Sequence, residues 1–138
     1  MVLDVATAIS SLLILHSAWR WIVLVSAATS VARALQGWAA GRQWTAGDRW
    51  SALIFVGALD IQLTLGLLLL SVAAAATRVA FAPHVAAMIA VVVLAHAGKV
   101  LASRAERPQA QQRLSALFST PAFALMLAAI PWGRPLLR

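Results

Sequence analysis

Apolar residues in this chain gather into four long segments separated by short polar stretches. The segments span about residues 5–35, 50–76, 83–103 and 114–132. About 20 apolar residues in a helix cross the hydrocarbon of a bilayer, so each segment is long enough for a transmembrane helix. The first exceeds one crossing, which indicates a tilted, kinked or projecting helix. The pattern predicts an all-α integral membrane protein, a four-helix bundle with up-down-up-down connections.

Residues that start or stop helices set the expected boundaries. Pro83 suits the first turn of the third helix, where the missing N–H leaves no hydrogen bond unmade. Asp48 is placed to cap the second helix. Pro121 lies inside the fourth segment and predicts a kink or a late start. The polar stretch 105–112, which contains Pro108, predicts the linker before that segment.

The composition supports a membrane protein and excludes several other classes. Of the 138 residues, 62% are hydrophobic and 11% are charged, against about 45–50% and about 25% in soluble domains. Soluble enzymes need more polar surface, and disordered proteins contain less Leu, Ile and Val. The absence of cysteine excludes disulfides, thiolate metal sites and cysteine-anchored haem. We expect one membrane domain over 1–138, with an N-terminus that is retained because it carries Asp4 and no basic leader.

The net charge of +7 is distributed unevenly along the chain. Basic residues flank the first and third connections: Arg33, Arg42, Arg49, Lys99, Arg104, Arg107 and Arg113. The opposite side carries Arg78, Arg134 and Arg138. By the positive-inside rule, the two basic connections lie in the cytoplasm and both termini lie on the outer side. We expect a multi-pass protein of a bacterial inner membrane that contacts membrane lipid and has no nucleic-acid partner.

Four polar side chains lie within the apolar segments: His16, Arg20, Asp60 and His96. Charged groups in hydrocarbon cost about 2.5–3.5 kcal/mol each, so they need a role. The helical rise places Arg20 about 16 Å deep, and Asp60 and His96 about 20 Å deep, near the middle of the bilayer. We predict a buried pair of Arg20 and Asp60, which His96 joins by a hydrogen bond. Such a group either fixes helix packing or serves as a proton relay or as the surroundings of a cofactor.

Histidine is the strong uncharged metal ligand that this chain offers. Two imidazoles from different helices of a bundle are a usual way to hold haem b. His16 in the first helix would supply one imidazole, and either His84 or His96 in the third helix the other. These two lie about 120° apart around their helix, so they do not face the same centre. Residue spacing alone does not decide whether His84 or His96 is the second ligand.

Several short blocks along the chain form a recognisable series. They are Leu15-His16-Ser17-Ala18-Trp19-Arg20-Trp21, Gly37-Trp38, Asp48-Arg49, Leu59-Asp60-Ile61-Gln62-Leu63-Thr64-Leu65-Gly66-Leu67, Ala95-His96-Ala97-Gly98-Lys99 and Ile130-Pro131-Trp132. The series resembles small bacterial four-helix membrane proteins labelled cytochrome b-like, which open with an LHSxLRW block. The resemblance implies a four-helix bundle that carries haem b and moves electrons in the membrane.

The resemblance carries over to individual residues. His16 matches the first-helix histidine of these proteins. His84 matches a histidine that relatives often place in an EHP block, where this chain reads Ala82-Pro83-His84-Val85. His96 matches only some relatives, and others have a histidine at the position of Asp60. That exchange implies that residues 60 and 96 are neighbours.

The leading hypothesis is a haem b-binding electron-transfer protein that exchanges electrons with quinone and, if it is part of an enzyme, belongs to a membrane oxidoreductase. His16 and His84 are the expected axial ligands, with His96 as the alternative to His84. Arg20 is expected to stabilise a haem propionate or to pair with Asp60. Two other functions stay open: an accessory or scaffold subunit of a homo-oligomer or larger respiratory-type complex, and a proton or small-solute pathway through Arg20, Asp60 and His96.

Overall fold

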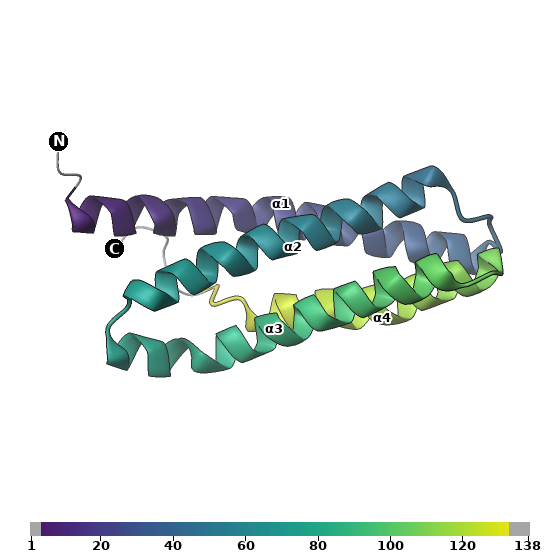
Figure 1. The fold of residues 1–138 in the computed structure, drawn as a ribbon. Coiled ribbons are helices and arrows are strands. Elements are labelled where there is room, and N and C mark those ends of the chain that lie inside the picture. Colours follow the sequence, from purple (N-terminus) through teal and green to yellow (C-terminus); the bar gives the residue numbers. More distant parts are fainter. Residues whose placement is uncertain (1–3, 133–138) are drawn as a thin grey trace.

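Four helices make up the described part of the chain in a computed structural model (Figure 1). The structure describes residues 4–132. The helices are α1 (Val5–Ala39), α2 (Ala46–Val72), α3 (Ala75–Arg104) and α4 (Pro108–Ala129). Because the connections between them are short, successive helices run antiparallel. The predicted all-α four-helix bundle with up-down connections is confirmed.

Each helix packs against two neighbours around a shared core. α1 and α3 each contact both α2 and α4, so α1 and α3 lie across the diagonal of the bundle. Every helix contributes fully buried side chains to the core, among them Ala27, Leu59, Val91 and Met126. Small residues allow close approach, because a Cβ added at Gly98 would lie 2.5 Å from the Cβ of Phe118. The core therefore ties all four helices together.

Three of the described helices are long and apolar enough to cross a membrane. They are α1 over Ala6–Ala39, α2 over Ala46–Val72 and α3 over Thr77–Arg104. Large apolar side chains on these helices point outward and are more than half exposed, including Val25, Val79 and Val93. Such apolar outer surfaces suit contact with lipid, and the chain is a multi-pass membrane protein. The first turns of α4 are rich in glutamine, and the fourth span stays a prediction.

The start of α2 differs from the expected one. Thr45 is the N-cap residue, and its hydroxyl accepts a hydrogen bond from the Asp48 N–H at 3.3 Å. The Asp48 carboxylate in turn accepts from the Thr45 N–H at 2.8 Å. The prediction that Asp48 is the N-cap is wrong, because Asp48 is the third helical residue and completes a capping box. With these two hydrogen bonds, α2 begins at Ala46, whereas the apolar segment begins at about residue 50.

Prolines also occupy other positions than expected. α3 begins well before Pro83, so this proline lies inside the helix and not in its first turn. The alanine-rich stretch before it favours helix. α4 begins at Pro108 itself, since proline at the first helical position gives up no hydrogen bond. The expected linker 105–112 shrinks to 105–107, and α4 starts early and continues through Pro121.

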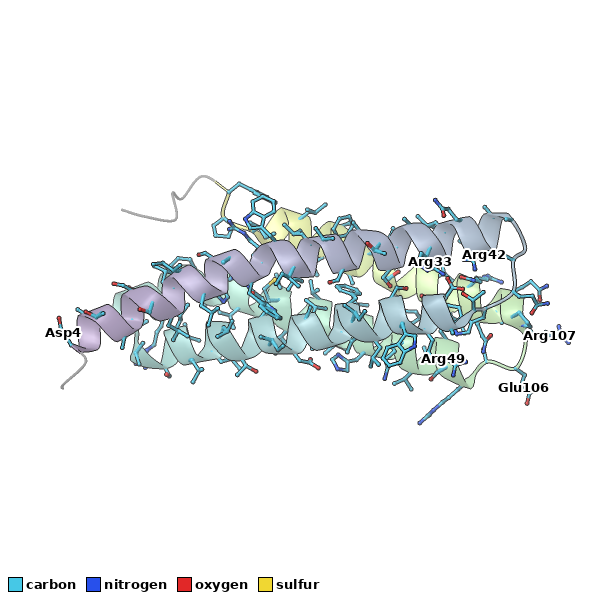
Figure 2. All side chains as sticks on the ribbon, turned by 90° about the horizontal axis from the view of Figure 1, so that it is seen from above. Asp4, Arg33, Arg42, Arg49, Glu106 and Arg107 are labelled. Atoms are coloured by element: carbon cyan, nitrogen blue, oxygen red, sulfur yellow. The ribbon has the colours of Figure 1, made fainter. Side chains whose placement is uncertain are left out.

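Charged side chains gather at one end of the bundle (Figure 2). Around the α1–α2 and α3–α4 connections lie Arg33, Arg42, Arg49, Glu106 and Arg107, whereas Asp4 lies at the opposite end. The four arginines of this set define the basic end. It coincides with the two connections that the charge pattern singles out. Two further basic residues expected on the opposite side, Arg134 and Arg138, fall outside the described residues.

α4 is shorter than the other helices and ends before them (Figure 1). The first turns of α1 and α3 and the last turns of α2 extend past its end. The carbonyl of Ala129, the last residue of α4, meets the side chain of His84 on α3. The end of α4 therefore marks the level at which His84 lies.

Candidate functional site

Three of the predicted site residues lie near one another beside the end of α4. His16 on α1 is within electrostatic range of both Arg20 and His84. His16 and Arg20 are one helical turn apart, and His84 comes from the diagonal helix α3. The bundle thus brings an imidazole from each of two helices and one guanidinium to the same region.

Gln62 on α2 fixes the position of the half-buried His16. The Gln62 Nε2 donates to the His16 carbonyl oxygen at 3.1 Å and lies 3.2 Å from the imidazole Nε2. An amide nitrogen only donates, so in this contact the proton of a neutral imidazole is on Nδ1. The His16 Nδ1 is buried without a hydrogen-bond partner, and so is the Gln62 Oε1. The site therefore contains polar atoms whose hydrogen-bonding capacity is unused, which is rare in a protein interior.

Gly66 provides the room for the His16 ring. A Cβ added at Gly66 would lie 3.2 Å from the imidazole Cε1 and 3.7 Å from Nδ1. Because Gly66 is four residues after Gln62, both lie on the face of α2 that meets His16. Gln62 holds the His16 imidazole in position, and Gly66 leaves space beside it.

His84 is held by the end of α4. Its Nδ1 is 2.8 Å from the carbonyl oxygen of Ala129. A carbonyl oxygen only accepts, so Nδ1 carries a proton and Nε2 of the neutral ring is an acceptor. The ring also meets Phe81 edge to face at a centroid distance of 6.4 Å. A backbone carbonyl on Nδ1 is the arrangement that orients histidines toward metals through Nε2.

Arg20 lies against aromatic rings. Its Cζ is 5.5 Å from the ring centroid of Trp21 and 5.8 Å from that of Trp132. The two rings are themselves 6.4 Å apart. The Arg20 Nε is buried without a hydrogen-bond partner, and no ion pair joins Arg20 to Asp60 among the described residues. Cation–π contact, rather than a carboxylate, stabilises this guanidinium here.

Asp60 and His96 form a separate pair on the outer face of α2 and α3. The His96 Nε2 is 3.5 Å from the Asp60 Oδ2, which agrees with the expectation that residues 60 and 96 are neighbours. The His96 Nδ1 is 2.9 Å from the Val92 carbonyl oxygen and carries a proton. The contact to Asp60 is therefore attractive only when a further proton lies between the two side chains. Both are about half exposed, at 41% and 51%.

The largest polar network surrounds Asp48 at the basic end, and sequence reasoning missed most of it. The Asp48 carboxylate accepts two hydrogen bonds from Arg42, each 2.9 Å long, and lies 3.0 Å from Arg33. It also accepts from the Gln112 side chain at 3.2 Å. The hydrogen bond with Asp48 raises the pKa of Arg42. The spacing of Thr45 and Asp48 signals the capping box, but no local signal points to Gln112.

The donor set near the end of α4 fits haem iron better than a bare metal ion. No group of three or more His, Cys, Asp or Glu side chains able to hold a metal is present in the part of the chain that the structure describes. Two imidazoles from different helices suit the axial positions of haem. The Nε2 of His84 is free of the Ala129 contact and is an available nitrogen ligand. The buried Nδ1 of His16 has no hydrogen-bond partner, and it could ligate iron only after its proton leaves that atom, which gives up the contact of Nε2 with the Gln62 amide.

Comparison of the chain with known protein families, with curated proteins and with solved structures found no match.

Proposed function

We propose that this chain is a membrane electron carrier that binds haem b between α1 and α3, with His16 and His84 as axial ligands. The observation that carries the proposal is that these two imidazoles, from diagonal helices, lie within electrostatic range of each other, with His84 held at the end of α4. Histidine is the common axial ligand of protein-bound haem, and helical bundles hold cofactors with side chains from facing helices.

The surrounding residues have distinct roles in this proposal. Bound haem would supply one-electron redox chemistry. The Ala129 carbonyl orients the His84 ring and increases the basicity of its Nε2. Gly66 leaves space for the His16 ring. The unpartnered Nε of Arg20 suits a carboxylate acceptor such as a haem propionate.

The proposed orientation and partners follow from the membrane setting. The basic end faces the cytoplasm of a bacterial inner membrane, both termini face outward, and α4 forms the fourth span. An apolar quinone in the bilayer is the proposed partner for electron exchange, because the bundle presents apolar walls and short connections to its surroundings.

Absorption spectroscopy of the protein purified from haem-replete cells tests this function. We expect a Soret band that shifts on reduction, and loss of most of the haem in His16→Ala and in His84→Ala. His96→Ala is the matched control, because the side chain of His96 pairs with that of Asp60 and not with that of His16. A purified, monodisperse protein without a Soret band contradicts the proposal. Loss of haem in His96→Ala but not in His84→Ala assigns the second ligand to His96.

A second candidate function is that of a subunit in a membrane assembly, and the Asp60–His96 pair favours it. Half-exposed polar side chains in the middle of apolar helices are unfavourable against lipid. A neighbouring membrane chain, including a second copy of this one, would cover them.

Cysteine cross-linking tests this second candidate, because the chain has no native cysteine. Val93 is 61% exposed and lies one turn before His96, so Val93→Cys reports on this face of α3. Leu117→Cys on α4, where Leu117 is 48% exposed, is the control. Preferential disulfide-linked dimers of Val93→Cys in native membranes support self-association through this face. Equal cross-linking of the two variants indicates random collision and contradicts it.

A further inference from the structure

A groove with a volume of about 670 Å³ runs along the outer surface between α1 and α2. Its walls include Trp21 and Val25 from α1 and Trp50 and Ile54 from α2, and Arg33 and Gly47 lie at its basic end. From Trp21 to Arg33 the helical rise amounts to about 18 Å. One leaflet contributes half of a hydrocarbon core about 30 Å thick. The groove therefore extends over about the depth of one leaflet, from the basic end toward the middle of the bilayer.

The basic end of the groove carries uncompensated positive charge. Arg33 and Arg42 both pair with the single carboxylate of Asp48, at 3.0 and 2.9 Å. Two guanidinium groups thus share one negative charge, and one positive charge is left over. The Arg33 Nε is also without a hydrogen-bond partner. An anion would complete this cluster.

The first turn of α2 adds to the positive potential at this end. A Cβ added at Gly47 would lie 2.7 Å from the Arg33 Nη2. The Arg33 guanidinium therefore packs directly against the backbone of Gly47. The N-terminus of a helix favours negative charge because its N–H groups point outward along the axis. Arg33 and the start of α2 therefore both contribute positive potential at the basic end of the groove.

The hydroxyl groups that line the groove donate hydrogen bonds to backbone carbonyls of their own helices. The length of the groove is therefore suited to an apolar chain. Ser26 donates to the Val23 carbonyl at 2.9 Å, and Thr29 donates to the Val25 carbonyl at 2.8 Å. Ser51 donates to the Asp48 carbonyl at 2.9 Å. Since these hydroxyl protons are already donated, the length of the groove offers no free hydroxyl donor among these three residues.

We propose that this groove binds an anionic phospholipid, with its phosphate at Arg33 and one acyl chain along α1 and α2 as far as Trp21. The volume of the groove lies within the range of about 300–1,000 Å³ that is typical of small-molecule sites. Trp50 lines the groove near the start of α2, and in the proposed orientation this places it at headgroup depth, where tryptophan is enriched in membrane proteins. The site differs from the haem site and does not depend on it.

Native mass spectrometry in mild detergent tests the proposal with phosphatidylglycerol and phosphatidylcholine of equal chain length. We expect one phosphatidylglycerol molecule to stay bound in the presence of excess phosphatidylcholine. Ser26→Phe fills the groove without changing any charge and should abolish this binding. Arg33→Gln should weaken it about fivefold, the effect of one basic side chain near an anionic headgroup.

Arg49→Gln is the matched control, because Arg49 lies at the same end of the bundle but does not line the groove. It should keep the preference for phosphatidylglycerol. Arg33→Gln also removes an ion pair, so Ser26→Phe decides the outcome if Arg33→Gln fails to fold. Equal phosphatidylglycerol binding by the wild type and folded Ser26→Phe would overturn the proposal. Equal affinity of the wild type for both lipids would overturn it as well.

Discussion

The side-chain amide of Gln112 in α4 donates a hydrogen bond to the carboxylate of Asp48 in α2 at 3.2 Å. Both residues are almost fully buried, at 0% and 2% exposed. The same carboxylate pairs with Arg33 of α1 and with Arg42 of the α1–α2 connection. One buried acidic group therefore joins three helices at the basic end. Buried charges in networks of this kind are strongly destabilising when a partner is removed.

Asp48→Asn is expected to destabilise the folded protein by about 2 kcal/mol, the usual strength of a hydrogen bond to a charged group. The amide keeps the shape of the side chain but leaves Arg33 and Arg42 without their negative partner. Thermal unfolding in detergent, followed by circular dichroism, measures the change. Arg49→Gln serves as a charge-changing control at the same end of the bundle. Unfolding temperatures that match the wild type would show that the network does not contribute to stability.

Gly37→Ala is expected to be destabilising, because a Cβ at this position runs into the buried side chain of Gln112. Overpacking of a rigid site costs about 1–3 kcal/mol. Gly57→Ala is the matched control, since no atom lies within 4 Å of its added Cβ. That substitution should leave stability unchanged or raise it by up to about 1 kcal/mol, through better helix propensity. Identical effects at both glycines would argue against close packing of α1 on α4.

Gly66→Leu tests whether the room beside His16 matters for haem. The larger side chain displaces the imidazole, whose Cε1 would be 3.2 Å from the first added carbon. We expect haem content to fall severalfold while the protein remains folded and monodisperse. Gly57→Leu, with an open position on the same helix, should retain its haem. Full haem occupancy in Gly66→Leu, measured by the pyridine haemochrome spectrum, would remove His16 from the ligand set.

Much of the fold could be predicted from the sequence because long apolar segments have few alternatives in a membrane. The helices were expected from hydropathy alone, but their ends depend on local hydrogen bonds and proline geometry. Thr45 and Asp48 begin α2 through a capping box, and Pro108 begins α4 as its first residue. Both features lie in polar stretches, where hydropathy assigns no helix.

The candidate site was harder to predict because side-chain partners depend on helix rotation. The depth estimate places Asp60 and His96 at one level, and these two residues do meet. The same estimate gives Arg20 a similar depth, yet its guanidinium lies over Trp21 and Trp132. Depth sets the level along a helix, whereas the direction in which a side chain points depends on the packing of all four helices. For the same reason, no local pattern connects Gln112 with Asp48.

The orientation of the bundle can be determined with single cysteines, because the chain has none of its own. Gln43→Cys lies in the α1–α2 connection at the basic end, and Ala74→Cys lies between α2 and α3 at the other end. By the positive-inside rule, a membrane-impermeant thiol reagent added to intact spheroplasts should label Ala74→Cys. It should label Gln43→Cys only after the membrane is permeabilised, which serves as the accessibility control for each variant. The reverse labelling would place the basic end outside, and the proposed site for anionic phospholipid would then lie in the outer leaflet of the membrane.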